Sequence, residues 1–406
     1  MSTATVKLSE VAEINPRVEA RPTLDTLVSF LGMADVDAES GTTTRGKERR
    51  YAEVAKGYTQ FANRDLLVAK ITPCFENGKI AQAELDHPHG TGSTEFHVIR
   101  PDRAVLDDRF LLRFLRQPYV RIAGERRMTG SAGQRRVPEA YLADLQIPLI
   151  PISEQRQIAQ ILDNVDALRT KRRKAIALLK DLAQSIFLDM FGDPLSNPMG
   201  WDRVQLGDLL LRIDSGKSPQ CLDRPAEHDE WGVLKLGAVT QCVYRPEENK
   251  ALPASIEADP RHEVQAGDLL FTRKNTPELV AASAYVRETR ERLLLPDLVF
   301  RLVPVETAPV NKIYLHSLLT YPPKRRKVQE LASGSAASMP NISKSRLLEF
   351  KIELPSLELQ EKFAARMNAL EGAKLRNLAH LAELDSLFAS LQDRAFRGEL
   401  WGAPAA

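Results

Sequence analysis

The chain has 406 residues and a mass of 45.4 kDa, which is too long for one ordinary domain and fits two or three, each with a core of its own. Its composition, 43% hydrophobic and 27% charged, is that of a globular protein, and no apolar run approaches the ~18 residues of a membrane span, so a membrane protein is excluded. The net charge of +2, from 56 basic and 54 acidic residues, leaves any nucleic-acid binding to local clusters of charge.

The first residues, MSTATVKLSE, lack the basic and apolar segments of a secretion signal. The three cysteines, Cys74, Cys221 and Cys242, are odd in number and form no CxxC pair. We therefore expect a reduced, cytoplasmic protein without disulfides or a structural zinc site.

The chain repeats itself with an offset of 203 to 205 positions. The segment DLLVAKITP, from Asp65 to Pro73, returns as DLLFTRKNTP from Asp268, and the tripeptide GSA at Gly130 returns at Gly334. Each copy continues with a short β-like run, LQIPLIP or FKIELP, and then enters a long helical pattern. A period of this length is too long for a solenoid, so the repeated unit is a domain followed by a helix.

Four segments follow from this repeat. We expect a first globular domain over residues 1–152, a central helix over 153–192, a second globular domain over 199–355 and a C-terminal helix over 356–398. Both domains mix short β-rich runs, such as EFHVIR and LVFRLVPV, with helical runs such as VNKIYLHSLLTY. Short strands divided by Pro and Gly turns predict an α+β fold for each domain.

The two helices carry the clearest periodic signal. From Ser153, a good N-cap, the first runs about 38 residues without Pro or Gly and stops at Gly192. At ~1.5 Å per residue it would reach roughly 57 Å, more than a small domain requires. Apolar residues step by threes and fours, as in a coiled-coil seam. We expect this seam to contain Ile158, Leu162, Val165, Phe363, Met367 and Leu370.

Two interpretations of the helices stay open. Each could pack only on its own domain, or the two seams could bury each other, which their similar lengths and patterns favour. In the second case the helices run antiparallel about a pseudo-two-fold axis. Two domains held in this way could contact two separated half-sites of one DNA duplex, and because the domains differ in sequence, the half-sites would differ as well.

Candidate DNA contacts fall at corresponding places in the two repeats. Basic clusters fit phosphate contacts, whereas polar residues in the Gly-Ser loops and in the loops after DLL fit contacts to bases. In the first repeat we select Lys70, Thr72, Arg126, Arg127, Ser131, Gln134, Arg135 and Arg136. In the second we select Arg273, Lys274, Asn275, Lys324, Arg325, Arg326, Ser335 and Asn341. The plainer alternative is that these are solvated helix faces and ordinary turns, while the Asp and Leu residues of DLL are interpreted as turn and core.

No sequence motif indicates catalysis. The chain contains neither GxxxxGK[ST] nor GxSxG, and Asn197-Pro198-Met199 lacks the second proline and the aromatic residue of an amino-methyltransferase site. His87 and His89 have no evident companion ligands and are interpreted as a surface turn. We therefore expect no catalytic residue, no metal site and no cofactor on this chain.

Three runs resemble the specificity subunits of type I restriction-modification systems: IPLIPISEQRQIAQILDNVDAL from Ile147, FGDPLSNPMGWDRVQLGDL from Phe191, and IELPSLELQEKFAARMNALEGAK in the second copy, where Leu359-Gln360 replaces Glu154-Gln155. The resemblance covers nearly the whole chain. It implies two target-recognition domains that each read one half of a bipartite, asymmetric sequence in double-stranded DNA. It also implies that the helices act as spacer and as docking surface for two methyltransferase subunits.

The same resemblance implies that partner subunits catalyse the reactions of the complex. S-adenosylmethionine would be bound by the methyltransferase, and ATP and Mg²⁺ would be used on the partner subunits, including a restriction subunit that translocates and cleaves DNA. This chain would be non-catalytic. Two other functions stay open: a coiled-coil scaffold, which would bind DNA without sequence preference, and an enzyme with an unrecognised site, which would modify or cut DNA by itself.

Overall fold

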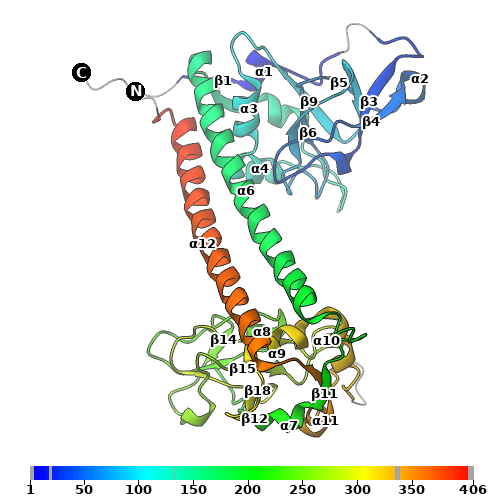
Figure 1. Cartoon of the computed structure of the whole chain (residues 1–406). Coiled ribbons are helices and arrows are strands. Elements are labelled where there is room, and N and C mark those ends of the chain that lie inside the picture. The colour runs from blue at the N-terminus through cyan, green and yellow to red at the C-terminus, as the bar shows by residue number, and fades with distance from the viewer. Residues whose placement is uncertain (1–3, 18–20, 132, 334–338, 401–406) are drawn as a thin grey trace. The chain divides into compact units, whose positions relative to one another are not determined.

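The computed structural model describes residues 4–17, 21–131, 133–333 and 339–400 (Figure 1). Its contacts divide the chain into two compact units, unit 1 with residues 1–175 and 377–406, and unit 2 with residues 176–376. The two long helices are α6 (Ile152–Phe191) and α12 (Leu357–Phe396). Each has one end in unit 1 and the other end in unit 2. The division expected from the sequence follows chain order, whereas the contacts assign the two ends of each helix to different units.

Unit 1 holds two four-stranded sheets and a two-stranded ribbon within its described residues. Its strands are β1 (Thr5–Lys7), β2 (Ala12–Ile14), β3 (Leu27–Leu31), β4 (Lys47–Arg50), β5 (Thr59–Ala62), β6 (Leu66–Ala69), β7 (Ile80–Gln82), β8 (His89–Gly92), β9 (Phe96–Pro101) and β10 (Gln146–Pro148). Its shorter helices are α1 (Leu8–Val11), the 3-10 helix η1 (Met33–Asp35), α2 (Tyr51–Val54), α3 (Asp108–Leu115), α4 (Pro118–Arg126) and α5 (Glu139–Ala143). The sheet orders are β2-β9-β6-β7 and β4-β3-β8-β5, and β1 pairs with β10.

Unit 2 holds, in its described part, a four-stranded sheet, a three-stranded sheet and a ribbon. Its strands are β11 (Asp202–Gln205), β12 (Leu210–Ser215), β13 (Gly232–Leu234), β14 (Asn249–Ala251), β15 (Leu269–Thr272), β16 (Ser283–Tyr285), β17 (Leu293–Leu294), β18 (Val299–Pro304) and β19 (Lys351–Leu354). Its shorter helices are α7 (Leu206–Leu209), α8 (Gly237–Thr240), the 3-10 helix η2 (Pro260–His262), α9 (Lys312–Thr320), α10 (Pro322–Gln329) and α11 (Lys344–Glu349).

The two units share one strand connectivity, which confirms the repeated α+β fold. The order β2-β9-β6-β7 of unit 1 returns as β12-β18-β15-β16 in unit 2, and the ribbon β1-β10 returns as β11-β19. In the second sheet β3 pairs antiparallel with β4 and parallel with β8, just as β13 pairs antiparallel with β14 and parallel with β17. Unit 1 extends this sheet by β5.

Each unit has its own core, to which both long helices contribute. In unit 1, Leu66 of β6 and Phe110 of α3 share a cluster of buried residues with Ile158 at the start of α6 and Ala395 near the end of α12. In unit 2 the rings of Phe187 and Phe191 on α6 lie 5.8 and 5.2 Å from the ring of Phe363 on α12. The helices are therefore held to the globular part of each unit as well as to each other.

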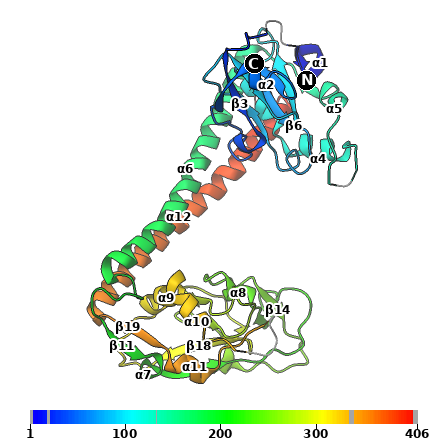
Figure 2. The same cartoon turned by 90° about the vertical axis from the view of Figure 1, so that its right-hand side faces the viewer.

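The two long helices run antiparallel within unit 1. Arg169 Nε donates to Asp385 Oδ1 over 2.6 Å, and Arg172 Nη1 donates to Asn377 Oδ1 over 3.2 Å, so rising residue numbers on α6 meet falling numbers on α12. Both views show α6 and α12 side by side (Figures 1 and 2). The expectation that the helices pack on each other in antiparallel fashion is confirmed.

Candidate nucleic-acid interface

The DLL segment that opens each candidate loop is a turn followed by buried strand. Asp65 accepts a hydrogen bond from the backbone N–H of Ala62 over 2.7 Å, and its carboxylate takes two hydrogen bonds from Arg100, over 2.9 and 2.7 Å. In unit 2 Asp268 pairs with Arg301 over 3.2 Å in the same way. Because these carboxylates are already bound inside the fold, they fix where the following loops begin.

In unit 1 the loop after β6 lies against the Gly-Ser loop. Thr72 N–H donates to Arg135 O over 2.9 Å, and Val137 N–H donates to Lys70 O over 2.8 Å. A β-bridge joins Ile71 and Arg136. Two sets of candidate residues that lie about sixty positions apart in the chain thus form one surface.

Unit 2 brings the corresponding loops together in the same way. Ile342 N–H donates to Arg273 O over 2.8 Å, Lys274 and Asn341 form a β-bridge, and Arg273 Nε donates to Asn341 Oδ1 over 3.0 Å. The guanidinium group of Arg273 also lies over the ring of Phe300, 5.0 Å from its centroid. Ser335, the other candidate of this loop, lies outside the described residues.

The exposed candidates of unit 1 include two arginines. Arg126 and Arg127 at the end of α4 are exposed, and so are Ser131 and Gln134. No ion pair of Arg126 or Arg127 is found in the part of the chain that the structure describes. Their charges are therefore available to a polyanion.

Arg136 is held by a carboxylate. Its guanidinium donates to Glu95 over 2.9 and 2.8 Å, while 41% of the side chain stays exposed. The hydrogen bonds from Arg136 lower the pKa of Glu95, and the charge of Lys70 lowers it further. Such a pair presents the outer edge of Arg136 in a fixed orientation.

A second carboxylate lies under Thr72 and Arg135. The hydroxyl of Thr72 donates to Glu76 Oε1, and Arg135 Nη2 lies 3.9 Å from the same oxygen. The other carboxylate oxygen of Glu76 is buried and has no hydrogen-bond partner among the described residues. Glu76 and Glu95 were not selected from the sequence, because nothing in the local pattern connects them with arginines about 40 to 60 residues away.

The structure contradicts the selection of Lys324. Its side chain is buried, and Nζ lies 2.6 Å from Glu353 Oε2 and 3.1 Å from Lys351 O. Burial lowers the pKa of Lys324, and the carboxylate of Glu353 opposes that shift. A phosphate group could not reach this ammonium group without breaking a buried ion pair, so the prediction of a DNA contact is wrong here.

Asn275 and Arg325 also form hydrogen bonds within unit 2. Asn275 is buried, donates to Thr240 Oγ1 over 3.3 Å and accepts from Thr276 N–H over 2.9 Å. Arg325 donates to backbone carbonyls of the segment after β15, to Glu278, Leu279, Val280 and Ala281, over 3.1 to 3.3 Å. Asn275 is buried and hydrogen-bonded inside the fold, which contradicts its selection, whereas Arg325 is half-buried with Nε and Nη2 bound to carbonyls, and its contact with DNA stays a prediction.

Two candidates of unit 2 remain open to solvent or nearly so. Arg326 on α10 is exposed, and Lys274 is half-buried. Lys327, its neighbour in the basic run, pairs with Glu330 over 3.0 Å at the surface. The outward face of α10 is thus basic, although its inward face uses Lys324 for a buried ion pair.

A basic strand was not selected from the sequence. All four residues of β4, Lys47–Arg50, are exposed, and β4 lies at an edge of its sheet. Arg49 pairs with Glu53 over 3.6 Å and Arg50 with Asp25 over 3.5 Å. The signal was visible as the run TRGKERR, which has no equivalent at β14 in the second repeat.

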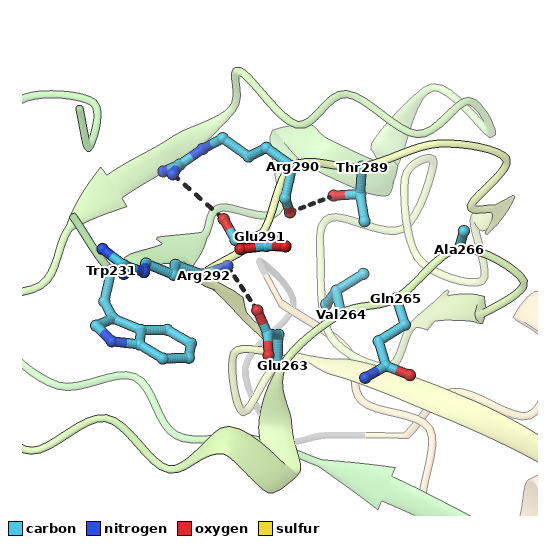
Figure 3. Close-up of a pocket in the computed structure, with 9 residues that line it drawn as sticks. All are labelled: Trp231, Glu263, Val264, Gln265, Ala266, Thr289, Arg290, Glu291 and Arg292. Atoms are coloured by element: carbon cyan, nitrogen blue, oxygen red, sulfur yellow. Dashed lines mark hydrogen bonds between the residues drawn. The ribbon is translucent and has the colours of Figure 1, made fainter. Parts of the chain in front are cut away.

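Unit 2 also contains an open pocket of about 450 Å³ (Figure 3). Trp231 and Glu263 line it together with Arg290 and Arg292. Arg290 Nη1 lies 3.2 Å from Glu230 O, and Arg292 donates to Asp229 O. These arginines hold the turn at residues 228–230.

The described residues include no group of three or more His, Cys, Asp or Glu side chains arranged to hold a metal ion. His87, one of the two histidines of the HxH motif, lies 3.0 Å from Glu48 Oε2. Among the helices that the structure describes, none combines the length and apolar character needed to cross a membrane.

The expected seam residues lie in two places. Ile158, Leu162 and Val165 are buried in unit 1, the first two within its main core cluster. Phe363 and Met367 belong to the core of unit 2, and Leu370 packs against it. Each set contributes to the core of its own unit, where it is joined by residues from the other long helix.

Comparison with known proteins gives one consistent result. Residues 3–178 match the family described as "Type I restriction modification DNA specificity domain". The EcoEI type I restriction enzyme specificity subunit of Escherichia coli is 29% identical over 450 aligned positions, which cover 88% of this chain and 75% of that protein. The EcoAI specificity subunit of Escherichia coli is 34% identical over 184 positions, which cover 44% of this chain and 31% of that protein.

Solved structures show the same fold. The S subunit of a type I restriction-modification system from M. genitalium aligns over 97% of this chain and 96% of its own, with a TM-score of 0.61 and 15% identity. A chain from a structure describing complex assembly and conformational transition of the type I R-M system aligns over 98% of both chains, with a TM-score of 0.58 and 20% identity. At these identities the likeness concerns the fold alone.

Proposed function

We propose that the chain is a specificity subunit of a type I restriction-modification complex, and that it supplies the DNA address of this complex without catalysing a reaction itself. In this proposal the two units read the two halves of an asymmetric, bipartite sequence. The observation that carries it is the repeated loop pair: the loop after β6 or β15 lies against the Gly-Ser loop in both units, with exposed or half-exposed donors at its surface.

The residues proposed to contact DNA are the candidates that are exposed or half-exposed on the loop pair and on the adjoining helices. In unit 1 they are Lys70, Thr72, Arg126, Arg127, Ser131, Gln134, Arg135 and Arg136. In unit 2 they are Arg273, Lys274, Arg325, Arg326 and Asn341. Arginines at the ends of helices fit phosphate oxygens, whereas the exposed side-chain amide of Gln134 has a donor and an acceptor that complement N7 and the N6 amino group of adenine in the major groove.

The long helices are proposed to dock the partner subunits. Exposed leucines on both helices support this role, because a docked partner would remove their apolar side chains from water. On α6 and α12 these are Leu168, Leu178, Leu182, Leu375, Leu378 and Leu387. Two methyltransferase subunits, which bind S-adenosylmethionine, would dock there, and restriction subunits, which use ATP and Mg²⁺, would join the same complex.

The competing function is a scaffold that gathers proteins through these leucines and binds DNA without sequence preference. A selection from random-sequence duplex DNA distinguishes the two, using the full chain assembled with its methyltransferase subunits. The proposed function predicts enrichment of one split motif. Gln134→Ala should change the bases selected in one half-site only, whereas Arg394→Ala, which removes an exposed arginine from α12, should leave the motif intact. Enrichment of no motif would favour the scaffold.

A further inference from the structure

One buried glutamine joins α6 to the rest of unit 1. Gln155 is the fourth residue of α6 and has no solvent exposure. Its Oε1 accepts a hydrogen bond from Asp107 N–H over 2.8 Å, and its Nε2 donates to Val105 O and Ile150 O, each over 2.8 Å. One amide group thereby connects the helix, the segment before it and the segment before α3.

Unit 2 has the same arrangement around Gln360. This residue is the fourth of α12 and is also fully buried. Its Oε1 accepts from Asn311 N–H over 2.8 Å, and its Nε2 donates to Pro309 O over 3.0 Å and Pro355 O over 2.8 Å. Every hydrogen bond of the first glutamine has a counterpart, although Leu359 precedes this glutamine where Glu154 precedes the other.

The backbone groups held by the glutamines belong to the residues that begin α3 and α9. Asp107 is the N-cap of α3 and accepts hydrogen bonds from Arg109 N–H and Phe110 N–H, both over 3.0 Å. Asn311 caps α9 through Ile313 N–H over 2.9 Å. The residue that caps each short helix with its side chain thus also donates its backbone N–H to the glutamine of the long helix, which fixes the start of the short helix relative to the long one.

The capped helices α3 and α9 pack in the same cores as the strands that precede the candidate DNA contacts. In unit 1, Phe110 of α3 shares the core with Leu66 and Val68 of β6, and Lys70 follows β6 directly. In unit 2, Tyr314 of α9 shares the core with Leu269 and Phe271 of β15, which leads to Arg273. A rotation of α3 or α9 on its long helix would carry the reading loop with it.

We propose that Gln155 and Gln360 are positioning residues that lock the orientation of each reading unit on its long helix and thereby set the number of unread base pairs between the two half-sites. This inference rests on the proposed function. It assigns gap selectivity to two side chains that do not contact DNA.

Only an amide of this length satisfies all three backbone groups. Glutamate would lack the donors for Val105 O and Ile150 O, and methionine would leave these oxygens and Asp107 N–H without a partner. Unit 1 has a second connection between the same helices, because Asp163 of α6 pairs with Arg109 over 2.9 Å and with Arg113 over 2.7 Å. The unit should therefore still fold when the glutamine is changed.

The test uses the full chain with its methyltransferase subunits. Once random-duplex selection has given the wild-type motif, binding is measured on duplexes that keep both half-sites and lengthen or shorten the gap by one or two base pairs. Wild type should prefer one gap by about tenfold or more, and Gln155→Met or Gln360→Met should reduce that preference to about threefold or less. Binding to a duplex with a single half-site should stay unchanged. Gln157→Met, an exposed glutamine of the same helix, is the matched control.

The outcomes separate this inference from the proposed function. Variants that lose affinity equally at every gap, with the preference intact, would overturn the positioning role. A wild-type complex that selects no split motif overturns the proposed function and the inference with it. If Gln155→Met loses its cooperative melting transition, Gln155→Glu, which keeps the chain length and an acceptor, takes its place. Amide hydrogen exchange of the wild type needs no variant: fast exchange of Asp107 N–H and Asn311 N–H would contradict the clamp.

Discussion

Lys324 Nζ lies 2.6 Å from Glu353 Oε2, and the two side chains are only 6% and 3% exposed. Arg203 approaches the other oxygen of the same carboxylate over 3.1 Å. The basic run of α10 is therefore divided by helix geometry: Lys324 and Val328, one turn apart, face inward, whereas Arg326 and Lys327 face solvent. Lys324 thus forms a buried ion pair, whereas Arg326 and Lys327 of the same run lie at the surface.

Removing Lys324 should affect folding rather than DNA binding. Lys324→Ala leaves Glu353 buried with Arg203 as its remaining partner, so the expected loss of stability is that of one charged hydrogen bond, about 1.5–3 kcal/mol. Chemical denaturation should show this loss, with the selected DNA motif unchanged. Arg326→Ala should give the reverse, stability within about 0.5 kcal/mol of wild type but weaker DNA binding. A stable Lys324→Ala protein with impaired DNA binding would contradict the assignment.

The exposed arginines of unit 1 should contribute affinity without specificity. Arg126→Ala and Arg127→Ala should each weaken binding to all duplexes alike and reduce the slope of log K against log salt by about 1, because each removes one phosphate contact. Binding measured between 50 and 200 mM salt, by fluorescence anisotropy for instance, gives the slope directly. An unchanged slope would remove these residues from the interface.

The Glu95–Arg136 pair should matter for discrimination between sequences. Glu95→Gln removes the charge that holds Arg136 and also a negative charge close to Lys70. We expect tighter binding to unrelated duplexes and a specificity ratio reduced roughly tenfold, about 1.4 kcal/mol. Competition between the selected motif and an unrelated duplex measures this ratio. Glu125→Gln, at an exposed position of α4, is the control and should leave it unchanged.

Acid should weaken unit 1 through His97. Its Nε2 lies 2.9 Å from Val137 O and its Nδ1 lies 3.2 Å from Asn15 Nδ2, so a neutral ring with its proton on Nε2 satisfies both contacts. Burial, aided by the charge of Lys70, lowers the pKa of His97 from 6.5. Below that pH the unfolded chain binds the proton more readily than the folded one, so the free energy of unfolding should fall as the pH falls from 6.5 to the folded pKa.

A pKa of His97 that is lower by one on the pH scale reduces the free energy of unfolding in acid by about 1.4 kcal/mol. Urea unfolding of the full chain at pH 7.5 and 5.0 should show a smaller acid loss for His97→Gln than for wild type. His380→Gln, which removes an exposed histidine of α12, should behave like wild type. Equal pH dependence of the His97→Gln variant and wild type would show that this ring is not responsible.

Features encoded by local pattern could be predicted from the sequence. Pro and Gly bound both long helices, so the expected first helix, 153–192, differs from α6 by one residue at each end, and the expected 356–398 differs from α12 by one and two. The matched DLL segments predicted that the two units share one fold, although the order of the strands could not be predicted. Both signals depend on residues close together in the chain.

What the sequence could not supply depends on distant partners. Glu353, which removes Lys324 from the surface, belongs to β19, and Glu95, which holds Arg136, lies before β9. Asn275 occupies a loop position typical of a base contact, yet Thr240 from another element binds it. Charge and polarity alone do not distinguish a free donor from one already used inside the fold.

The central claim, that this chain reads a split DNA sequence, is tested most directly by methylation. The chain would be produced with its methyltransferase subunits in a host that lacks adenine methylation, and methylated adenines would be mapped across the genome by single-molecule sequencing. We predict one asymmetric motif in two parts with a fixed gap. A fully assembled complex that methylates adenines without any such motif would contradict it.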